Sequence, residues 1–477
     1  MNLNELEFAS INALLKEKKL SCHDLVEYYL KKIDEGMHFN AFISVLRDRA
    51  FNSAKAIDQK IKQSQAGKLA GLIIAIKDNI NIKGEITSCG SKILSNFVSP
   101  YDATVIKRLE KADAIIIGKT NMDEFAMGSS NENSYFGIVK NPHDRSRVPG
   151  GSSGGSTVAV SARLAMAALG SDTGGSIRQP ASFCGVVGLK PTYGRISRFG
   201  LVAFASSLDQ IGPIARSVED CARILEVIAG YDPLDSTSAD VAVPEYSQSI
   251  KESLQDLKIG LPEEYFSSGL NPEIKKQIDT CSHLLEQLGV KTVTISLPHN
   301  EYAIATYYIL ATAEACSNLA RYDGARYGYR ADSISDLENM YVTSRSTGFG
   351  DEVKRRIMLG TFVLSAGYYE AYYQKAQKAR TLIKRDFDQA FKTCDCILTP
   401  TSPTTAFKIG EKINNPLTMY LSDIYTVSAN LAGLPALSIP CGHDSQNLPI
   451  GIQILAKPFD EETVFRVGYA LEHCLKQ

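Results

Sequence analysis

The chain has 477 residues, of which 44% are hydrophobic and 22% are charged, and its 51 Lys and Arg nearly balance 53 Asp and Glu, for a formal net charge of -2. This composition is that of a globular protein and excludes disordered, collagen-like and fibrous classes. A protein that binds nucleic acid by itself usually carries a basic surface. We therefore do not expect nucleic acid to be the main partner of this chain alone.

The apolar runs and the cysteines predict a cytoplasmic protein. The longest runs, Leu72–Ile76 and Ala114–Ile117, are much shorter than the about 20 residues of a membrane helix, and the N-terminus lacks the apolar core of a signal peptide. The ten cysteines are scattered, which favours reduced thiols. Cys394 and Cys396 are the one close pair, and zinc would need a second pair. We expect no metal site.

Residues 1–65 are predicted to form an N-terminal helical region. Ser21 and Asp24 have the spacing of a capping box, which marks the start of a helix. The apolar residues that follow them fall on one face of such a helix: Leu25, Val26, Tyr29 and Ile33.

From residue 66 onward the pattern predicts an α/β core. Short apolar runs at 72–76 and 114–117 are typical of buried strands, and a helical pattern lies between them. Such alternation predicts a sheet covered by helices on both faces. We expect further helices at 217–230 and 272–288. Further strands are expected at 258–261, 292–295, 396–399, 436–439 and 450–455.

Two stretches of this core have unusual composition. Residues 140–215 are rich in Gly, Ser and Pro but include apolar segments, which indicates tight turns within a packed core. Residues 301–390 are predicted to be a helical insertion, and they hold 11 of the 22 tyrosines. These tyrosines could cover a pocket, meet a partner or fill the packing between helices. The expected organisation is one core, 66–477, built from both ends of the chain around this insertion.

Two familiar motifs are present only in part. Residues 113–120 approach a phosphate-binding loop, but Asp113 stands where the first glycine is required, so a strand ending in a turn is the better interpretation. Residues 150–154 fit a G-x-S-x-G nucleophile elbow, which needs a strand before it, yet the preceding segment is polar and proline-bounded. A triad of that kind also needs a histidine, and no context marks any of the four that follow: His283, His299, His443 and His473.

Three other residues point to a different chemistry. Lys77 follows the strand 71–76, and Ser152 and Ser176 lie in Ser/Gly loops at the two ends of one apolar segment. A serine hydroxyl needs a base to become a good nucleophile. Burial lowers the pKa of a lysine from ~10.4 toward the working pH, so Lys77 is a candidate base and one serine could relay the proton. Backbone N–H groups beside the second serine could bind an oxyanion: Thr173, Gly174 and Gly175.

Taken together, the loops at 150–156 and 171–180 resemble the signature of the amidase signature family, whose catalytic set is Ser–cis-Ser–Lys. The match includes the glycines, both serines, Asp172, Arg178 and Pro180. The resemblance implies an α/β fold with a central mixed β-sheet covered by helices on both faces. It also implies that Ser176 is the acylated nucleophile, that Ser152, preceded by a cis peptide bond, relays the proton, and that Lys77 is the base.

Further segments resemble one branch of that family, the glutaminase subunits of tRNA-dependent amidotransferases. One departure is His143, which stands where the branch has Trp, and the chain contains no Trp. This loop position is not expected to affect catalysis. The resemblance extends from about residue 70 to 455, nearly the whole chain, and its matching segments include 87–91, 122–128, 190–195, 204–213, 321–328 and 352–360.

The branch implies a glutamine-dependent carbon–nitrogen ligase of three subunits. Its A subunit hydrolyses glutamine and supplies ammonia, and a large B subunit, assembled with a small C subunit, converts Glu-tRNA(Gln) to Gln-tRNA(Gln) with ATP and Mg. Some complexes also act on Asp-tRNA(Asn), and the sequence does not determine this preference. No cofactor is implied for the present chain.

The resemblance also assigns glutamine-binding residues. Arg356 would bind the α-carboxylate and Asp423 the α-ammonium, with Tyr307 nearby, since a bidentate guanidinium and a carboxylate suit these groups. From the residues alone, Arg356 could equally lie on a solvated helix face, and Asp423 could cap a helix at 424–431.

Three other functions remain open at this point. A free-standing amidase would share the catalytic set and hydrolyse simple amides without partners. A scaffold would keep the fold, and Ser176→Ala would leave ammonia release unchanged. A histidine-dependent hydrolase would lose activity when one histidine is replaced.

Overall fold

A computed structural model describes residues 7–266, 269–332 and 334–476. Its strands form one mixed sheet in the order β1-β3-β2-β4-β6-β5-β10-β11-β9-β7-β8. Strand β2 runs parallel to β3 and β4, and β7 runs parallel to β8 and β9, whereas the other neighbours are antiparallel. The strands are β1 (Phe42–Val45), β2 (Ile73–Lys77), β3 (Ile115–Thr120), β4 (Ala167–Asp172), β5 (Val187–Lys190), β6 (Gln210–Ala215), β7 (Lys258–Pro262), β8 (Lys291–Ile295), β9 (Cys396–Pro400), β10 (Ala436–His443) and β11 (Pro449–Ala456).

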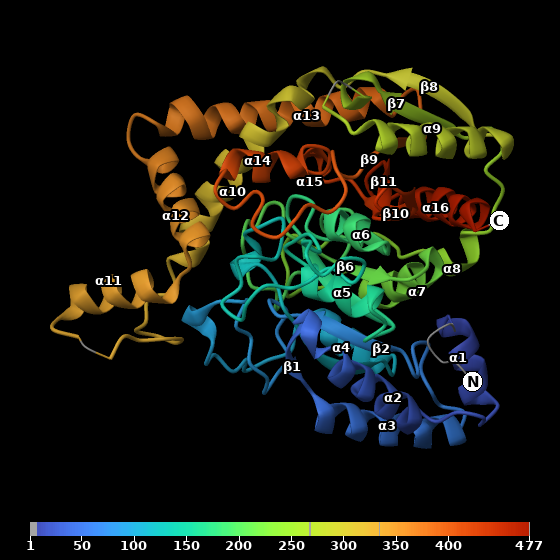
Figure 1. Cartoon of the computed structure of the whole chain (residues 1–477), viewed down its shortest axis with the longest axis horizontal. Coiled ribbons are helices and arrows are strands. Elements are labelled where there is room, and N and C mark those ends of the chain that lie inside the picture. Colours follow the sequence, from blue (N-terminus) through green and yellow to red (C-terminus); the bar gives the residue numbers. More distant parts are fainter. Residues whose placement is uncertain (1–6, 267–268, 333, 477) are drawn as a thin grey trace.

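Helices surround this sheet (Figure 1). None of the described helices combines the length and the hydrophobicity needed to cross a membrane. The helices are α1 (Phe8–Lys16), α2 (Cys22–Glu35), α3 (Arg47–Lys62), α4 (Thr104–Lys111), α5 (Gly154–Ser161), α6 (Arg178–Cys184), α7 (Val218–Ile228), α8 (Tyr246–Ser249), α9 (Pro272–Gln287), α10 (Ala303–Leu319), α11 (Leu337–Gly348), α12 (Asp351–Leu364), α13 (Lys375–Ala390), α14 (Pro416–Tyr420), α15 (Val427–Ala432) and α16 (Glu461–Leu475).

Both faces of the sheet are covered, as the sequence predicts. Gly451 of β11 lies directly against Ser182 of α6, whereas Ile454 of the same strand contacts Gly468 of α16. Because side chains alternate along a strand, positions 451 and 454 point to opposite faces. Helices α6 and α16 therefore pack on opposite sides, and this double cover explains why every residue of β11 is buried.

The N-terminal region packs directly on the core and is not purely helical. The capping box at Ser21 and Asp24 is confirmed. The prediction of helices alone over 1–65 is wrong at 42–45, where β1 pairs antiparallel with β3 at the sheet edge. A four-residue strand, Phe-Ile-Ser-Val, is too short to show a clear period. Gly71, at φ +86°, lies so close to Leu15 of α1 that a Cβ would collide with it.

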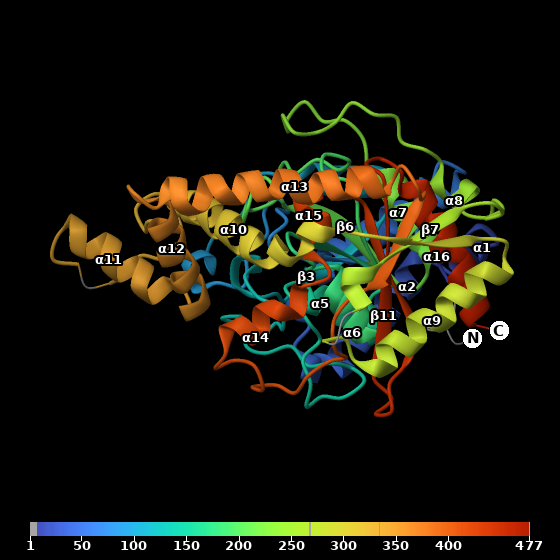
Figure 2. The same cartoon turned by 90° about the horizontal axis from the view of Figure 1, so that it is seen from above.

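Residues 301–390 contain helices α10 to α13, and part of this region projects from the sheet (Figures 1 and 2). We call α11 and α12, residues 337–364, the helical arm. Helix α10 packs against α12, α13 and α15, so it joins the arm to the body of the protein. The arm exposes several large apolar side chains: Leu337, Val342, Met358, Leu359 and Phe362.

Candidate active site

Lys77 is the last residue of β2 and is completely buried. Its Nζ donates hydrogen bonds to Ser152 Oγ at 2.7 Å, to Ser153 Oγ at 2.8 Å and to the Ser171 carbonyl at 3.3 Å. Burial disfavours the ammonium form and lowers the pKa of Lys77 to about 7. Three nearby carboxyl groups oppose this shift: Asp123, Asp172 and Asp209. At neutral pH a substantial fraction of this lysine is therefore an uncharged amine able to accept a proton.

The two serine loops meet beside this lysine. The peptide bond between Gly151 and Ser152 is cis, as the family resemblance implies. The N–H of Ser153 donates to the Ser176 carbonyl at 3.1 Å, which joins the first loop to the second. Ser152 is fully buried, whereas 8% of Ser176 is exposed. The residue predicted as nucleophile is thus the one that a substrate can reach, with the relay and base residues behind it.

A buried ion pair holds the loop that carries Ser176. Arg178 binds Asp172 through two hydrogen bonds of 3.1 Å and also contacts Asn430 Oδ1 at 2.6 Å and Gln453 Oε1 at 3.0 Å. Burial alone would raise the pKa of Asp172, but the charge and hydrogen bonds of Arg178 outweigh it and hold the pKa well below its usual range. The C-terminal third of the chain therefore fixes the geometry of the nucleophile loop.

The glycines next to Ser176 are required by close packing. A Cβ on Gly174 would collide with the ring of Tyr307, and one on Gly175, at φ +134°, would collide with Thr426. The predicted oxyanion role differs among these residues, because the N–H of Gly175 already donates to Asp172 Oδ1 at 2.8 Å. In this conformation the oxyanion prediction depends on Thr173 and Gly174.

The residues predicted to bind the ends of glutamine are buried in one cluster. Tyr307 of α10 lies against Gly174, and Thr426 Oγ1 donates to the Gly174 carbonyl at 2.6 Å and to the Asp423 carbonyl at 3.0 Å. Asp423 Oδ2 accepts a 2.5 Å hydrogen bond from Ser129 Oγ. Burial raises the pKa of Asp423 to about 7, against the opposing effects of Ser129 and the Arg356 charge. A bound ammonium group would restore the charged carboxylate.

Arg356 lies inside the protein and not on a solvated helix face. Only 3% of the residue is exposed, and its Nε donates to Glu352 Oε1 at 2.8 Å. Its guanidinium packs over the rings of Tyr308, at 5.2 Å, and Tyr420, at 5.5 Å. Aromatic walls hold the plane of the guanidinium in one orientation, which suits bidentate binding of a carboxylate.

Several residues of the site were not predicted. Ser153 lies next to Ser152 and binds the same lysine, so adjacency was the available signal. Asp123 is fully buried beside the cis peptide, where a Cβ on Gly151 would collide with its carboxylate. The other additions come from remote segments, so the sequence offered no spacing signal for them: Ser129, Thr426, Asn430 and Gln453.

The rejected motifs have structural explanations. Lys119, in the loop-like segment 113–120, is fully buried on β3 and pairs with Asp78 at 3.2 Å. The ring of His299 contacts Asp386 at 2.9 Å, and that of His143 contacts the Cys184 carbonyl at 3.0 Å. Within residues 7–266, 269–332 and 334–476, no group of three or more His, Cys, Asp or Glu is placed to hold a metal ion.

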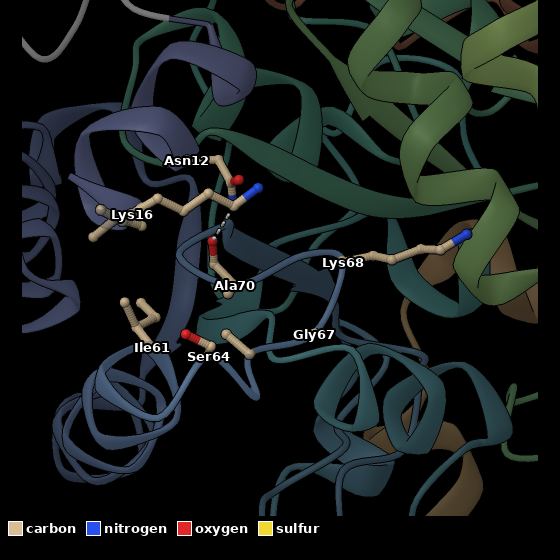
Figure 3. A pocket seen from close by; sticks show the side chains of 9 residues that line it. Asn12, Lys16, Ile61, Ser64, Gly67, Lys68 and Ala70 are labelled. Carbon is tan, nitrogen blue, oxygen red and sulfur yellow. Dashed lines mark hydrogen bonds between the residues drawn. The ribbon is translucent and has the colours of Figure 1, made fainter. Parts of the chain in front are cut away.

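A separate pocket, shown in Figure 3, is lined by residues that precede β2. Since Lys77 is the last residue of β2, this pocket lies toward the other end of the strand. It occupies about 460 Å³ between α1, the end of α3 and the segment before β2. Asn12 donates to the Ala70 carbonyl across it at 3.2 Å. The strand separates this pocket from the catalytic candidates, so its size does not make it part of the active site.

Known proteins share the fold of this chain and much of its sequence. The Amidase family matches residues 24–465. The glutamyl-tRNA(Gln) amidotransferase A subunit from Koribacter versatilis is 56% identical over 477 residues, covering 100% of this chain and 99% of the relative. The A subunit from Geobacillus thermodenitrificans is 57% identical over 474 residues, covering 99% and 98%. The crystal structure of the A subunit from Thermotoga maritima has a TM-score of 0.81 and 45% identity, covering 99% of this chain and 95% of that one. The chain therefore belongs to the amidase family, within its group of glutamyl-tRNA(Gln) amidotransferase A subunits.

Proposed function

We propose that this chain hydrolyses glutamine as the A subunit of a tRNA-dependent amidotransferase and supplies the ammonia to a partner subunit. The observation that carries the proposal is the buried contact of 2.7 Å between Lys77 Nζ and Ser152 Oγ, next to the loop of Ser176, which is 8% exposed. A lysine with a pKa lowered to about 7 is suited to general-base catalysis at neutral pH.

The proposed proton path uses the contact between Lys77 and Ser152 and the closeness of the two serine loops. Ser176 Oγ attacks the side-chain carboxamide carbon of glutamine while its proton passes to Ser152 Oγ, and the Ser152 proton passes to neutral Lys77. The tetrahedral intermediate places its negative charge near the backbone N–H groups of Thr173 and Gly174. Return of the proton through Ser152 to the leaving nitrogen releases ammonia and leaves a glutamyl ester on Ser176. Water then repeats the path, which releases glutamate and restores the serine.

The buried charges next to the nucleophile loop select glutamine. Arg356 binds the α-carboxylate and Asp423 binds the α-ammonium, with Tyr307 forming the wall between them and Gly174. A substrate that carries both complementary charges adds an ion pair to each of these buried groups, and charge-assisted hydrogen bonds in a buried site are strong. A simple uncharged amide would leave Arg356 with Glu352 and Asp423 with Ser129 as their partners and would gain nothing from either charge.

The complete reaction needs the other subunits. The B subunit, assembled with C, would use ATP and Mg to activate glutamate on tRNA(Gln) and join it to the ammonia. The near-neutral charge of the present chain supports this division, because tRNA binding requires a basic surface elsewhere. We place the reaction in the cytoplasm. The choice between Glu-tRNA(Gln) alone and Asp-tRNA(Asn) as well would belong to the partner.

Mass spectrometry after treatment with a diazoketone analogue of glutamine tests the proposal. We expect the label on Ser176, because the analogue is attacked by the residue that attacks glutamine. Ser176→Ala should remain unlabelled, whereas the exposed control Ser253→Ala should be labelled like the wild type. Labelling at Ser152 or at a histidine would contradict the assignment of the nucleophile.

A free-standing amidase is the alternative, since the catalytic set would be the same. The two functions differ in their substrate and in their dependence on partners. We expect glutamine hydrolysis to rise strongly when the B and C subunits and charged tRNA are added. Fast hydrolysis of uncharged amides by the chain alone would favour the alternative.

A further inference from the structure

We propose that Glu124 is a positioning residue that sets the location of Arg356 by capping the helix that carries it. The inference rests on the proposed function, because it concerns how the α-carboxylate of glutamine is recognised. Glu124 lies directly after Asp123, in the segment between β3 and the first serine loop. No step of the proton path uses it.

Glu124 provides the hydrogen-bond acceptor at the start of α12. Its Oε2 accepts the Gly350 N–H at 2.8 Å, and its Oε1 accepts a hydrogen bond from Ser91 Oγ. Gly350 is the N-cap residue of α12 and has no side chain to cap the helix itself. A free N–H at a helix start is stabilised by an oxygen acceptor, and a negative charge there also interacts favourably with the helix dipole. Glu124 supplies both from 226 residues away.

The fit between the two residues is tight. A Cβ on Gly350 would collide with Glu124 Oε2, so a larger residue there would displace the carboxylate from the Gly350 N–H. Glu124 is 3% exposed, and burial raises its pKa to about 7 despite the hydrogen bonds from Ser91 and Gly350. A carboxyl group is costly to bury. Glu124 connects the start of α12 to the segment beside the catalytic residues, and this role would explain why a carboxyl group is buried there.

This helix start helps to set where Arg356 lies. Arg356 stands in the second turn of α12, and Glu352 in the first turn holds its Nε. Much of the rest of α12 faces away from the core, with Met358 72% exposed and Phe362 43% exposed. Together with the close packing of Gly360 on Thr312 of α10, the capped start fixes the orientation of α12, so a shift at the start moves the guanidinium relative to the substrate site.

The same segment contacts the other parts of the site. Asp123 accepts the N–H of Asn131 at 2.9 Å and lies against Gly151 of the cis peptide. Ser129 donates to Asp423 at 2.5 Å. Residues 123–129 thus join the surroundings of the catalytic lysine to both of the groups proposed to bind the ends of glutamine. Glu124 is the member of this segment that reaches the helix of the arginine.

Steady-state kinetics of the assembled complex test this role with two substrates: glutamine, and γ-aminobutyramide, which lacks the α-carboxylate. We expect Glu124→Ala to raise KM for glutamine about 10-fold with kcat within about 2-fold, the pattern of lost ground-state binding. The kcat/KM for γ-aminobutyramide should not change. Glu124→Gln keeps an oxygen acceptor for Gly350 and should restore most of the glutamine KM. Asp351→Ala, at an exposed carboxylate in the same helix turn, is the matched control and should behave as the wild type.

A double mutant and hydrogen exchange complete the test. Adding Glu124→Ala to Arg356→Ala should raise KM no further, because the first change acts through the second residue. Amide exchange at residues 350–356 should be faster in Glu124→Ala. Equal kcat losses on both substrates, additive effects in the double mutant, or an unchanged glutamine KM would overturn this inference while leaving glutamine hydrolysis intact. A wild-type complex without glutamine turnover would instead overturn the proposed function itself.

Discussion

The proposed catalytic base lies at the end of a central strand, whereas the arginine proposed to bind glutamine lies on the helical arm. Lys77 ends β2, all five residues of which are buried between β3 and β4. Arg356 belongs to α12, a helix of 14 residues of which four are buried. The proposed chemistry thus sits where backbone pairing and packing allow little movement, and the proposed recognition sits on an element with fewer contacts.

This contrast has a physical reason. Proton transfer requires hydrogen-bond distances and a desolvated lysine, and both are obtained at the end of a central strand. Glutamine must enter and its products must leave, which favours recognition groups on an element that is more exposed than the central strands. The comparison predicts that changes at the strand ends will abolish catalysis, whereas changes on the arm will weaken binding.

The largest expected effect is at Lys77. Lys77→Ala should lower glutamine hydrolysis by about 10³-fold or more, because general-base catalysis contributes about 10² to 10⁴ and the serine relay loses its acceptor. Burst kinetics would measure acylation, and thermal melting of the same sample would show whether the protein is folded. The exposed Lys83→Ala serves as control. Normal acylation in Lys77→Ala would remove this residue from the role of base.

The buried ion pair behind the nucleophile loop should give the largest loss of stability. Arg178→Met leaves the carboxylate of Asp172 buried without its partner, which typically costs about 3–5 kcal/mol. Urea unfolding of the wild type and the variant would measure the difference in the free energy of unfolding. A loss below about 1 kcal/mol would mean that the surrounding amide groups suffice to hold Asp172.

The arm should show a binding effect without loss of catalysis. Arg356→Lys keeps the charge but loses the planar fork that binds a carboxylate in two places, so KM for glutamine should rise about 10- to 100-fold, that is about 1.4–2.7 kcal/mol. The turnover of saturating glutamine should change much less. The values of kcat and KM must be measured separately. A fall in kcat as large as the rise in KM would show that Arg356 takes part in catalysis, which would contradict the proposed difference between the arm and the strand ends.

The pH dependence isolates the lysine. Its folded-state pKa is lowered to about 7; below that pH the amine is charged and cannot accept a proton, so kcat/KM should rise as pH increases through about 7. Asp423 titrates in the same range. Butyramide, which has no α-ammonium, removes that second contribution and should give the same rise if Lys77 is responsible. A flat profile with butyramide would contradict the assignment.

The smallest effect is expected on the exposed face of the arm. Met358 is 72% exposed, so Met358→Ala should change the free energy of unfolding of the isolated chain by no more than about 0.5 kcal/mol. The buried Met122→Ala is the reference, where truncation typically costs about 2–5 kcal/mol. Similar losses at the two methionines would show that the arm is as firmly packed as the core.

The sequence predicted much of the core because its signals are local. Apolar runs at 72–76 and 114–117 correspond to the buried strands β2 and β3, and the Ser217 cap begins α7 as expected. The edge strand β1 was missed because four residues show no reliable period. The glycine-rich loops identified the two serines because close packing and positive φ restrict such positions to glycine.

By itself, the sequence determined the α/β class, the two serine loops and the candidate base, because buried strands and glycine turns leave their mark within a few residues. Only the tertiary structure decided that Lys77 is desolvated and that Arg356 is buried, since neighbours distant in sequence set both environments. The engagement of the Gly175 N–H by Asp172, and the capping of α12 by Glu124, were likewise decided in three dimensions. The burial and the hydrogen bonds of these residues depend on neighbours that only the folded chain brings together, and residue spacing along the chain does not predict them.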